Sequence, residues 1–527
     1  MRLNASSIPG YWMQGMPPDA TGTAAALADA AVSDVFAARF AEGSPPERVA
    51  LALAASRLRL RDGGLGLANH HQLRHAAYAA TFWAAWPACC KVCPDLLDIS
   101  LVEPEPHQHA AVAFAAAYDH VATVLGTVRQ RFGALDATVR HWVDGSKRSA
   151  YHPVLKKKSL ALPPREELAR TLKDPESNTP IRLNQSVLSA VLTCDVWLDV
   201  LCLASQFDTA NASAATVPHR EATRLISNSQ VGPGAAIGRL PDALVRQSTV
   251  HSTKWVTVIQ RHAGLYLTEL APALAAREAA GGHRTTQHER LGDDAINSAN
   301  ATHRHNQALE RVARALGAAG ARVTLCDRGD GRPASKEEAK RRYAHLNAGH
   351  VPDIAVGTTL YEVKAYTPYV SAAGRQLGTG YAGSGTPSTN DGHLIACGNT
   401  EEALVRTVLG LKQRGQPGEA FNRSTGAGYV RATDGDYADA LQKKYGVELF
   451  VIESTGALAP RSVRLLKALS KAVRKPAHDS TVYGRNRSTT RSFFVHHLSA
   501  IAAAVADADA LTIANAAAAI AFVGARA

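Results

Sequence analysis

The chain has 527 residues, 46% hydrophobic and 20% charged, enough for roughly two to four domains that each bury a core. Lys and Arg outnumber Asp and Glu by 58 to 46, and the formal charge of +12 favours an acidic partner such as nucleic acid over a small neutral metabolite. The seven cysteines are an odd number in a chain without a cleavable signal sequence, so we expect an intracellular protein with reduced thiols rather than a secreted one.

The first half of the chain has a mostly helical pattern. Apolar residues recur at helical spacing over residues 23–60, a glycine-rich turn follows at residues 63–67, and a second helical run passes through Tyr78 and Trp86. Helical spacing then continues over residues 110–275. This half is therefore predicted to be α-helical.

A change of pattern marks the second half. Residues 281–305 are polar and rich in histidine, which predicts a linker or a surface entry to the next domain, and helix mixed with strand follows it. The predicted elements are a helix over 309–316, a strand over 322–326, two strands over 351–366, helices over 401–414 and 436–445, a strand over 447–452, a basic amphipathic helix over 461–475 and a packed Ala-rich helix over 498–527. Residues 367–399 are rich in Gly, Ser and Thr and predict a functional flap or a disordered loop.

The motif that carries chemistry is Pro352-Asp353, followed after eight residues by Glu362-Val363-Lys364. Side chains alternate along a strand, so Glu362 and Lys364 share one face while Val363 enters the core from the other. The alternation predicts that the catalytic side chains of this strand all lie on one face.

A two-residue turn at Gly357-Thr358 places Asp353 directly opposite Glu362, about 4.5–5.5 Å apart at Cβ. Two carboxylates this close repel each other unless a cation lies between them, and Mg²⁺ or Mn²⁺ accepts such oxygen ligands. We therefore predict that Asp353 and Glu362 bind metal. Lys364 beside the ion would stabilise charge on an attacked phosphate, which predicts phosphodiester hydrolysis.

Further candidates flank this motif. Glu310, next to the apolar stripe of the preceding helix, is predicted to be the third metal ligand and catalytic carboxylate. His305 and Asn306 would orient substrate or water, although a polar helix start explains them equally well. A basic cluster lies between two predicted strands, where it would contact DNA phosphates or form a solvated face: Lys340, Arg341 and Arg342.

One other group has metal-like spacing. Cys90, Cys93, His107 and His109 are spaced somewhat like zinc ligands. Closely spaced cysteines in a Trp- and Ala-rich helical region are, however, more typical of buried thiols.

Three short segments carry a family resemblance. Arg304-His305-Asn306, Val351-Pro352-Asp353-Ile354 and Tyr361-Glu362-Val363-Lys364 together resemble the restriction-like PD-(D/E)XK endonuclease domain at the C-terminal end of site-specific non-LTR retrotransposon proteins. Upstream, residues 58–67 and the Ala-rich run to Trp86 look like the segment after the polymerase domain in reverse transcriptases of such elements.

The resemblance implies a metal-dependent DNA endonuclease that nicks target DNA in the nucleus, with DNA and element RNA as partners and no membrane. Asp293-Asp294 lacks the hydrophobic strands that flank a polymerase's paired aspartates, so no polymerase activity is expected. The family's Cys-Cys-His-Cys knuckle is also missing from its usual place. Two alternatives stay open: a catalytically silent retroelement remnant that acts as a DNA-binding or assembly module, and a host nuclease of repair or recombination type.

The predicted fold class is α+β, with a mostly α-helical N-terminal half and a restriction-endonuclease-like α/β core, a mixed sheet flanked by helices, in the C-terminal half. The predicted regions are residues 1–125, resembling a reverse transcriptase tail; 126–285, a helical and linker region of unknown role; 286–480, the nuclease-like domain; and 481–527, Ala-rich C-terminal helices.

Overall fold

The computed structural model describes most of the helical half and the predicted sheet. The described residues are 12–67, 69–135, 139–140, 143, 162–173, 185–210, 220–239, 254–282, 284–297, 301–326, 338, 341, 351–367, 437–473 and 493–524. The fold within them is α+β, mostly helical with one small mixed sheet, as the sequence predicted at this level. The predicted flap at 367–399 lies outside the described residues except for Thr367, and the predicted helix at 401–414 lies wholly outside them.

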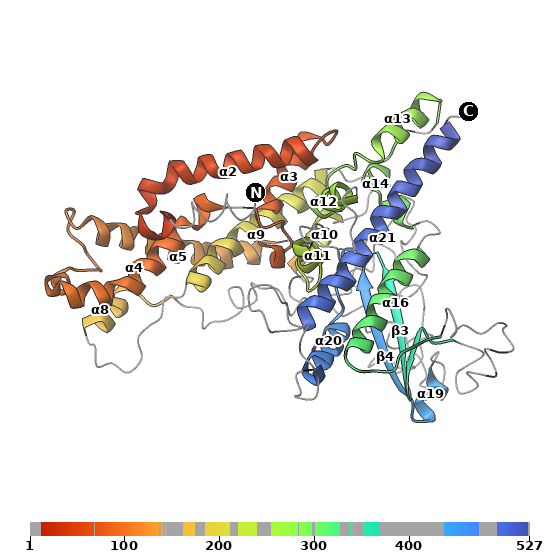
Figure 1. The fold of residues 1–527 in the computed structure, drawn as a ribbon. Helices are drawn as coiled ribbons and strands as arrows, with labels where there is room; N and C mark the ends of the chain where they lie inside the picture. Colours follow the sequence, from red (N-terminus) through yellow and green to blue (C-terminus); the bar gives the residue numbers. More distant parts are fainter. Residues whose placement is uncertain are drawn as a thin grey trace.

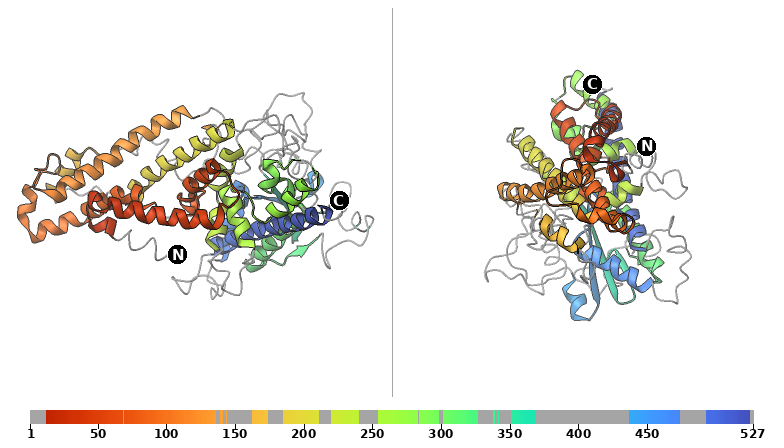
Figure 2. Two further views of the ribbon diagram at one scale, coloured as in Figure 1. Left: turned by 90° about the horizontal axis from the view of Figure 1, so that it is seen from above. Right: turned by 90° about the vertical axis from the view of Figure 1, so that its left-hand side faces the viewer.

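The helical half extends away from the sheet. In Figures 1 and 2 the long helices α2, α4, α5 and α9 lie together on the side away from the strands. The described helices of this half are α2 (Pro18–Phe40), α3 (Pro46–Ser56), α4 (His70–Val92), α5 (His109–Ala134), α8 (Arg165–Lys173), α9 (Gln185–Ala210), α10 (Arg220–Asn228), α11 (Pro233–Arg239), α12 (Trp255–Ala263) and α13 (Ala271–Ala279), with short 3-10 turns at Leu60–Asp62 and Pro94–Asp98. The continuous helical pattern predicted over residues 23–60 is interrupted at Pro45, which precedes α3.

The glycine-rich turn after α3 has a steric cause. Gly63 adopts a left-handed conformation with φ of 89°, which side chains with a Cβ disfavour. At Gly64 a Cβ would lie 2.1 Å from the carbonyl oxygen of Leu58, so a larger residue has no room. These two positions let the chain fold back tightly against the end of α3.

The sheet has four strands in the order β1-β2-β3-β4: β1 (Thr324–Leu325), β2 (Ile354–Val356), β3 (Thr359–Tyr366) and β4 (Gly446–Glu453). The first two pairings are antiparallel, and β3 and β4 are parallel. Around them lie α16 (Ala301–Ala318), α19 (Ala438–Gln442), α20 (Pro460–Val473) and α21 (Phe493–Gly524). The predicted helices and strands of this half are therefore present wherever the structure describes the chain, with some shortened.

Each face of the sheet has its own core. On one face α16, α20 and α21 pack on buried residues that include Ile354, Val363 and Phe450. On the other face Tyr437 and α19 residue Ala440 pack with buried residues of β3 and β4. Slipping β3 by one residue would turn all its side chains to the opposite face, so burial of Val363 and its neighbours fixes the register.

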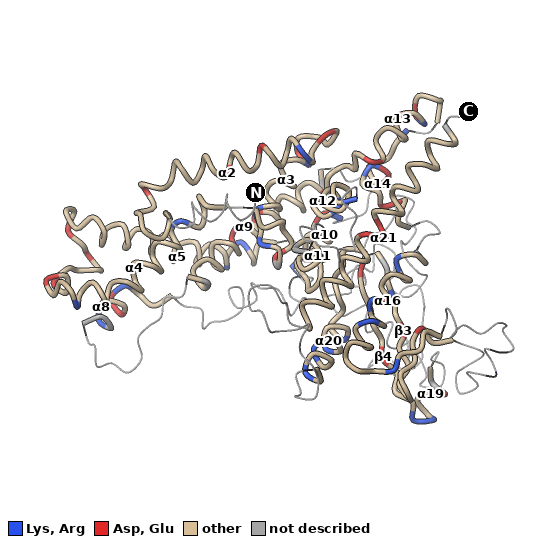
Figure 3. Tube along the Cα trace, viewed as in Figure 1, with Lys and Arg blue, Asp and Glu red and all other residues tan. Residues whose placement is uncertain are grey.

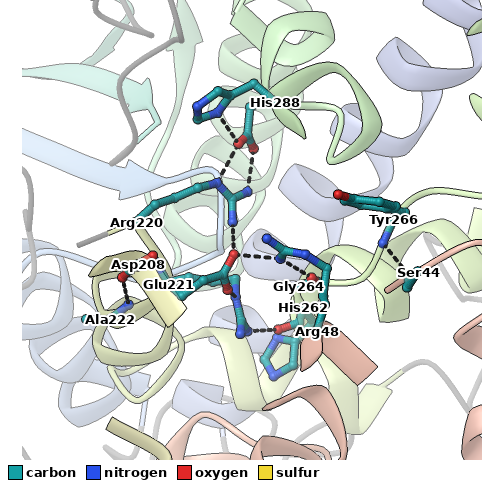
Figure 4. Close-up of polar contacts among 12 residues, drawn as sticks. Ser44, Arg48, Asp208, Arg220, Glu221, Ala222, His262, Gly264, Tyr266 and His288 are labelled. Carbon is teal, nitrogen blue, oxygen red and sulfur yellow. Dashed lines mark hydrogen bonds and ion pairs between the residues drawn. The ribbon is translucent and has the colours of Figure 1, made fainter. Parts of the chain in front are cut away.

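The prediction of a linker or surface entry at 281–305 is wrong for residues 284–297 and 301–305, which the structure describes as packed segments. They contain α14 (Gln287–Arg290), α15 (Asp293–Asn297) and the start of α16. His288 and Asp293 are buried, and Asp293 accepts two hydrogen bonds, at 2.7 and 2.9 Å, from Arg220 of α10 (Figure 4). A partner more than 70 residues away makes this polar segment stable in the interior.

The same buried network continues to α3. Glu221 accepts from Arg48 at 2.8 Å and from Arg224 at 2.7 Å, and Arg220 also donates to it (Figure 4). Arg48 in turn donates to the carbonyl of Gly264. The three guanidinium groups hold the pKa of the Glu221 carboxyl well below its ordinary value although burial opposes this. Ion pairs thus join segments from both predicted N-terminal regions.

Helix α21 is an integral part of the fold. It packs against α11, α13, α16 and α20, and its Ala502, Ala503 and Ala510 share one hydrophobic core with Phe36 and Val258 of the helical half. The structure therefore agrees with the prediction of a packed Ala-rich helix. The predicted region 481–527 shares its core with regions 1–125 and 126–285, while the region boundaries themselves stay predictions.

Asp509 of α21 forms a buried double ion pair. Its Oδ2 accepts from Arg261 of α12 at 2.8 Å, and its Oδ1 accepts from Arg304 of α16 at 2.9 Å. Asp507, two residues earlier and therefore on nearly the opposite side of the same helix, instead makes a looser pair with Lys254 at 3.6 Å, with a quarter of its side chain exposed. Asp509 therefore connects the helical half directly to the helix that leads into the sheet.

Three described helices are long and apolar enough to cross a membrane by length and composition alone: His109–Ala134, Val187–Asp208 and Phe493–Val523. In the fold, 44%, 56% and 33% of their most apolar stretches are buried inside the protein. The predicted lack of a membrane partner stays a prediction.

We predict that Asp509→Asn lowers the free energy of unfolding by about 3–5 kcal/mol, because removing one partner of a buried ion pair leaves desolvated charge unpaired. Asp507→Asn is the matched control on the same helix and should cost less than about 1 kcal/mol, as is usual for a partly exposed pair. Urea unfolding of the three proteins measures both values. Equal losses in the two variants would contradict the structural importance assigned to Asp509.

A second prediction concerns Asp208, whose carboxylate accepts the backbone N–H groups of Glu221 at 3.1 Å and Ala222 at 3.3 Å at the start of α10. Burial, together with the charge of Glu221, raises the pKa of Asp208 to about 7. A carboxyl group with a raised folded-state pKa stabilises the fold fully below its unfolded pKa of about 3.9, and this contribution is lost as the pH rises through about 7.

Asp208→Asn keeps an oxygen acceptor for these N–H groups but replaces the titratable carboxyl group by an amide that does not titrate. The stability of wild type minus that of Asp208→Asn should fall by at least about 1 kcal/mol between pH 4.5 and pH 7.5. Urea unfolding at several pH values measures the difference. A difference that is constant or grows with pH would contradict the assignment.

Candidate active site

The β2–β3 hairpin has the register predicted from its sequence. Val356 pairs with Thr359 and Ile354 with Tyr361, so the next step along the two strands brings Asp353 opposite Glu362. Gly357 in the two-residue turn has a φ of 56°, as expected for a turn that begins with glycine. The turn chemistry and the alternation of side chains therefore determine where the two carboxylates lie.

The two faces of β3 are also divided as predicted. Val363 is fully buried in the core formed with α16. Glu362 and Lys364 lie on the opposite face, and the Lys364 ammonium donates to Oε1 of Glu362. Glu362 is only 3% exposed, so its charge is held in the interior by this ion pair and by a further donor described below.

Asp353 directly precedes β2 and is only 8% exposed. Its Oδ2 accepts the backbone N–H of Val363 at 2.6 Å and lies 3.3 Å from Nε2 of His305. Burial raises the pKa of Asp353, and the nearby charge of Glu362 raises it further. This repulsion is the electrostatic property expected of two carboxylates that share a cation site.

His305 connects α16 to the hairpin. Besides its contact with Asp353, its Nε2 lies 3.0 Å from the carbonyl oxygen of Val363. Burial alone would lower the pKa of His305, but the hydrogen bond and charge of Asp353 outweigh burial and raise it. The preceding residue, Arg304, is held by Asp509 of α21, which fixes this end of the helix. The sequence had left open whether His305 was a site residue or only part of a polar helix start, and the structure brings it to the carboxylate of Asp353.

Tyr437 is a site residue that the sequence did not reveal. It is fully buried just before α19, and its hydroxyl donates to Oε2 of Glu362 at 2.5 Å. Both oxygens of Glu362 therefore have a hydrogen-bond donor, one from Lys364 and one from Tyr437. No local pattern signals this contact, because 75 residues separate Tyr437 from Glu362.

The structure does not bring Glu310 into a cluster with the hairpin carboxylates. Its side chain is 39% exposed and lies 4.0 Å from Arg314 on the same helix. Five residues correspond to about 140° around an α-helix, so Glu310 and His305 lie on different sides of α16. Asn306 is half-buried, and its Oδ1 lies 3.4 Å from Nδ1 of His305.

The predicted DNA-contacting residues are only partly described. Arg341 is exposed, while Lys340 and Arg342 lie outside the described residues. Figure 3 shows other basic residues along α20, beside the sheet, where Arg464, Lys467 and Lys471 are exposed.

The alternative zinc ligands do not form a metal cluster in the described part of the chain. Cys90 is buried and Cys93 is exposed, and His107 lies beside Glu105 on the surface.

The hairpin carries the groups that could hold a magnesium-like ion. Asp353 and Glu362 supply two carboxylates, and the carbonyl of Val363 and Oδ2 of Asp353 both approach the same nitrogen of His305. Among the described residues no three His, Cys, Asp or Glu side chains gather closely enough to enclose a metal. Mg²⁺ keeps several waters and commonly uses one or two carboxylates plus substrate phosphates, so Asp353, Glu362 and the Val363 carbonyl are the groups that could hold it.

Comparisons of this chain with protein-family models, with curated proteins and with solved structures found no match.

The geometry predicts different effects of two carboxylate substitutions on metal binding. Glu310→Gln should leave the affinity for Mn²⁺ within about twofold of wild type, as for a surface change away from the site. Asp353→Asn should weaken it more than about tenfold, because second-shell changes alone cost 10–100-fold. Isothermal titration calorimetry with Mn²⁺ measures both. A large loss in Glu310→Gln would restore Glu310 as the third ligand.

Proposed function

We propose that this protein is a divalent-metal-dependent DNA endonuclease of the PD-(D/E)XK type, derived from a retroelement and acting by nicking target DNA in the nucleus. The observation that carries the proposal is the approach of Asp353, Glu362 and Lys364 at one end of a hairpin, with the two carboxylates buried and mutually repelling. An ordinary surface hairpin has no need to bury two like charges.

The surrounding fold supports the proposal. The order of described elements is α16-β1-β2-β3-α19-β4-α20, with a mixed sheet covered by helices. That order is the one expected of a restriction-like nuclease core. Here β3 lies between an antiparallel and a parallel neighbour and carries both Glu362 and Lys364.

Each residue has a role that follows from its position. Asp353 and Glu362 would hold Mg²⁺ or Mn²⁺, which supplies a polarised phosphate and a more acidic water. Lys364, already within hydrogen-bond reach of Glu362, would stabilise negative charge on the phosphate in the transition state. His305 would hold Asp353 in place, because its imidazole contacts both the Asp353 carboxylate and the backbone of β3.

The charge of the chain fits a nucleic-acid substrate. The excess of 58 basic over 46 acidic residues attracts a polyanion, and the exposed basic residues of α20 and Arg341 lie in the same half of the chain as the hairpin. DNA is proposed as the substrate, with element RNA as a second partner.

A plasmid-nicking assay tests the function. Wild type should convert supercoiled DNA to open circles with Mg²⁺ or Mn²⁺ and lose this activity in EDTA. Lys364→Ala should lower the nicking rate by about 10²–10³-fold, as for loss of one transition-state donor. Asp353→Ala should lower it at least about 100-fold, because it removes a metal ligand.

Glu310→Gln is the control from the same domain, and it should nick at the wild-type rate. Equal activity in wild type, Asp353→Ala and Lys364→Ala would sink the proposed site. DNA binding by wild type without any metal-dependent nicking would instead support a silent binding or assembly module.

A further inference from the structure

We propose that Tyr437 is a positioning residue that holds the Glu362 carboxylate in its metal-binding orientation. The inference rests on the proposed nuclease function and adds a residue to its site. Tyr437 belongs to none of the motifs that point to that function. It directly precedes α19 and is 75 residues from Glu362 in the sequence.

The hydroxyl of Tyr437 has a fixed position. The residue is fully buried and belongs to the core that contains Leu360 and Leu449, neighbours on β3 and β4. Side chains packed this densely have little freedom to change rotamer. The phenol oxygen is therefore delivered to Oε2 of Glu362 by a rigid ring, at a distance of 2.5 Å.

Glu362 needs such an anchor. A glutamate side chain rotates about three bonds, and ordering it costs about 1.5–2 kcal/mol of conformational free energy. Asp353 lies opposite Glu362 across the hairpin, and like charges at paired strand positions repel, which also favours other rotamers of Glu362. Lys364 holds Oε1, but a lysine is itself a long, flexible chain. The rigid donor on Oε2 is what fixes the plane of the carboxylate.

A buried tyrosine hydroxyl needs some hydrogen-bond acceptor, so the kind of acceptor shows whether the Tyr437 bond does more than meet that need. Tyr118, in the helical half, satisfies its hydroxyl on the backbone carbonyl of Pro163, also at 2.5 Å. Tyr437 instead donates to an ionised side chain, and charge-assisted bonds of this kind are roughly twice as strong as neutral ones. Tyr118 is therefore a matched control: a buried tyrosine whose hydroxyl bond is far from the candidate site.

The test compares Tyr437→Phe with Tyr118→Phe at a temperature where both are folded. Mn²⁺ affinity is measured by calorimetry without DNA, melting temperature is measured without metal, and nicking is measured over a range of Mn²⁺ concentrations. Tyr437→Phe should bind Mn²⁺ about 10–100-fold more weakly and need correspondingly more metal for half-maximal nicking, as for loss of a second-shell partner. Tyr118→Phe should match wild type in both, although its melting temperature also falls.

A double-mutant cycle with Glu362→Gln separates positioning from a general structural effect. If Tyr437 acts through Glu362, Tyr437→Phe should have no further effect on Mn²⁺ affinity in the Glu362→Gln background. The inference is overturned if Tyr437→Phe leaves Mn²⁺ affinity unchanged, or if it lowers the affinity equally in wild type and in Glu362→Gln. The proposed nuclease function would still stand in either case, provided that wild type nicks DNA. A wild type that neither binds Mn²⁺ nor nicks overturns the proposed function and the inference together.

Discussion

The buried carboxylate of Asp509 is the constraint on which the arrangement of the chain depends. Its two oxygens pair with Arg261 of α12 and Arg304 of α16, helices on opposite sides of the predicted boundary near residue 286. The charges of Asp509 and Arg304 are buried, so each one is tolerated only while its partners stay in place. Because His305 directly follows Arg304, the ion pair that joins the two halves also determines where α16 meets the hairpin.

At the hairpin two buried carboxylates, those of Asp353 and Glu362, repel each other. Asp353 and Glu362 face each other across two strands, and the structure offsets their repulsion with donors from different segments. Asp353 accepts from the backbone of β3 and contacts His305, while Glu362 accepts from Lys364 and Tyr437. A site whose carboxylates are already oriented loses little entropy when it takes up a cation, and this preorganisation is the physical basis of the proposed hydrolysis.

Local rules explain which parts of the site could be predicted. The turn at Gly357 and the alternation along β3 were sufficient to place Glu362 opposite Asp353 and Val363 in the core, and the structure agrees. The polar stretch at 281–305 misled prediction, since its buried Asp293 is satisfied by Arg220 from a distant helix. The restriction-like identity of the core and its chemistry remain proposals, because fold class alone does not imply function.

The sequence by itself determined the α+β class, the hairpin register and the division of β3 into a chemical face and a buried face. Each of these follows from residue types and spacing within about a dozen positions, where backbone geometry leaves few choices. Only the tertiary structure decided that His305 contacts Asp353, that Tyr437 contacts Glu362 and that Glu310 faces elsewhere on α16. Those outcomes depend on how segments tens of residues apart pack against one sheet, which no local periodicity specifies.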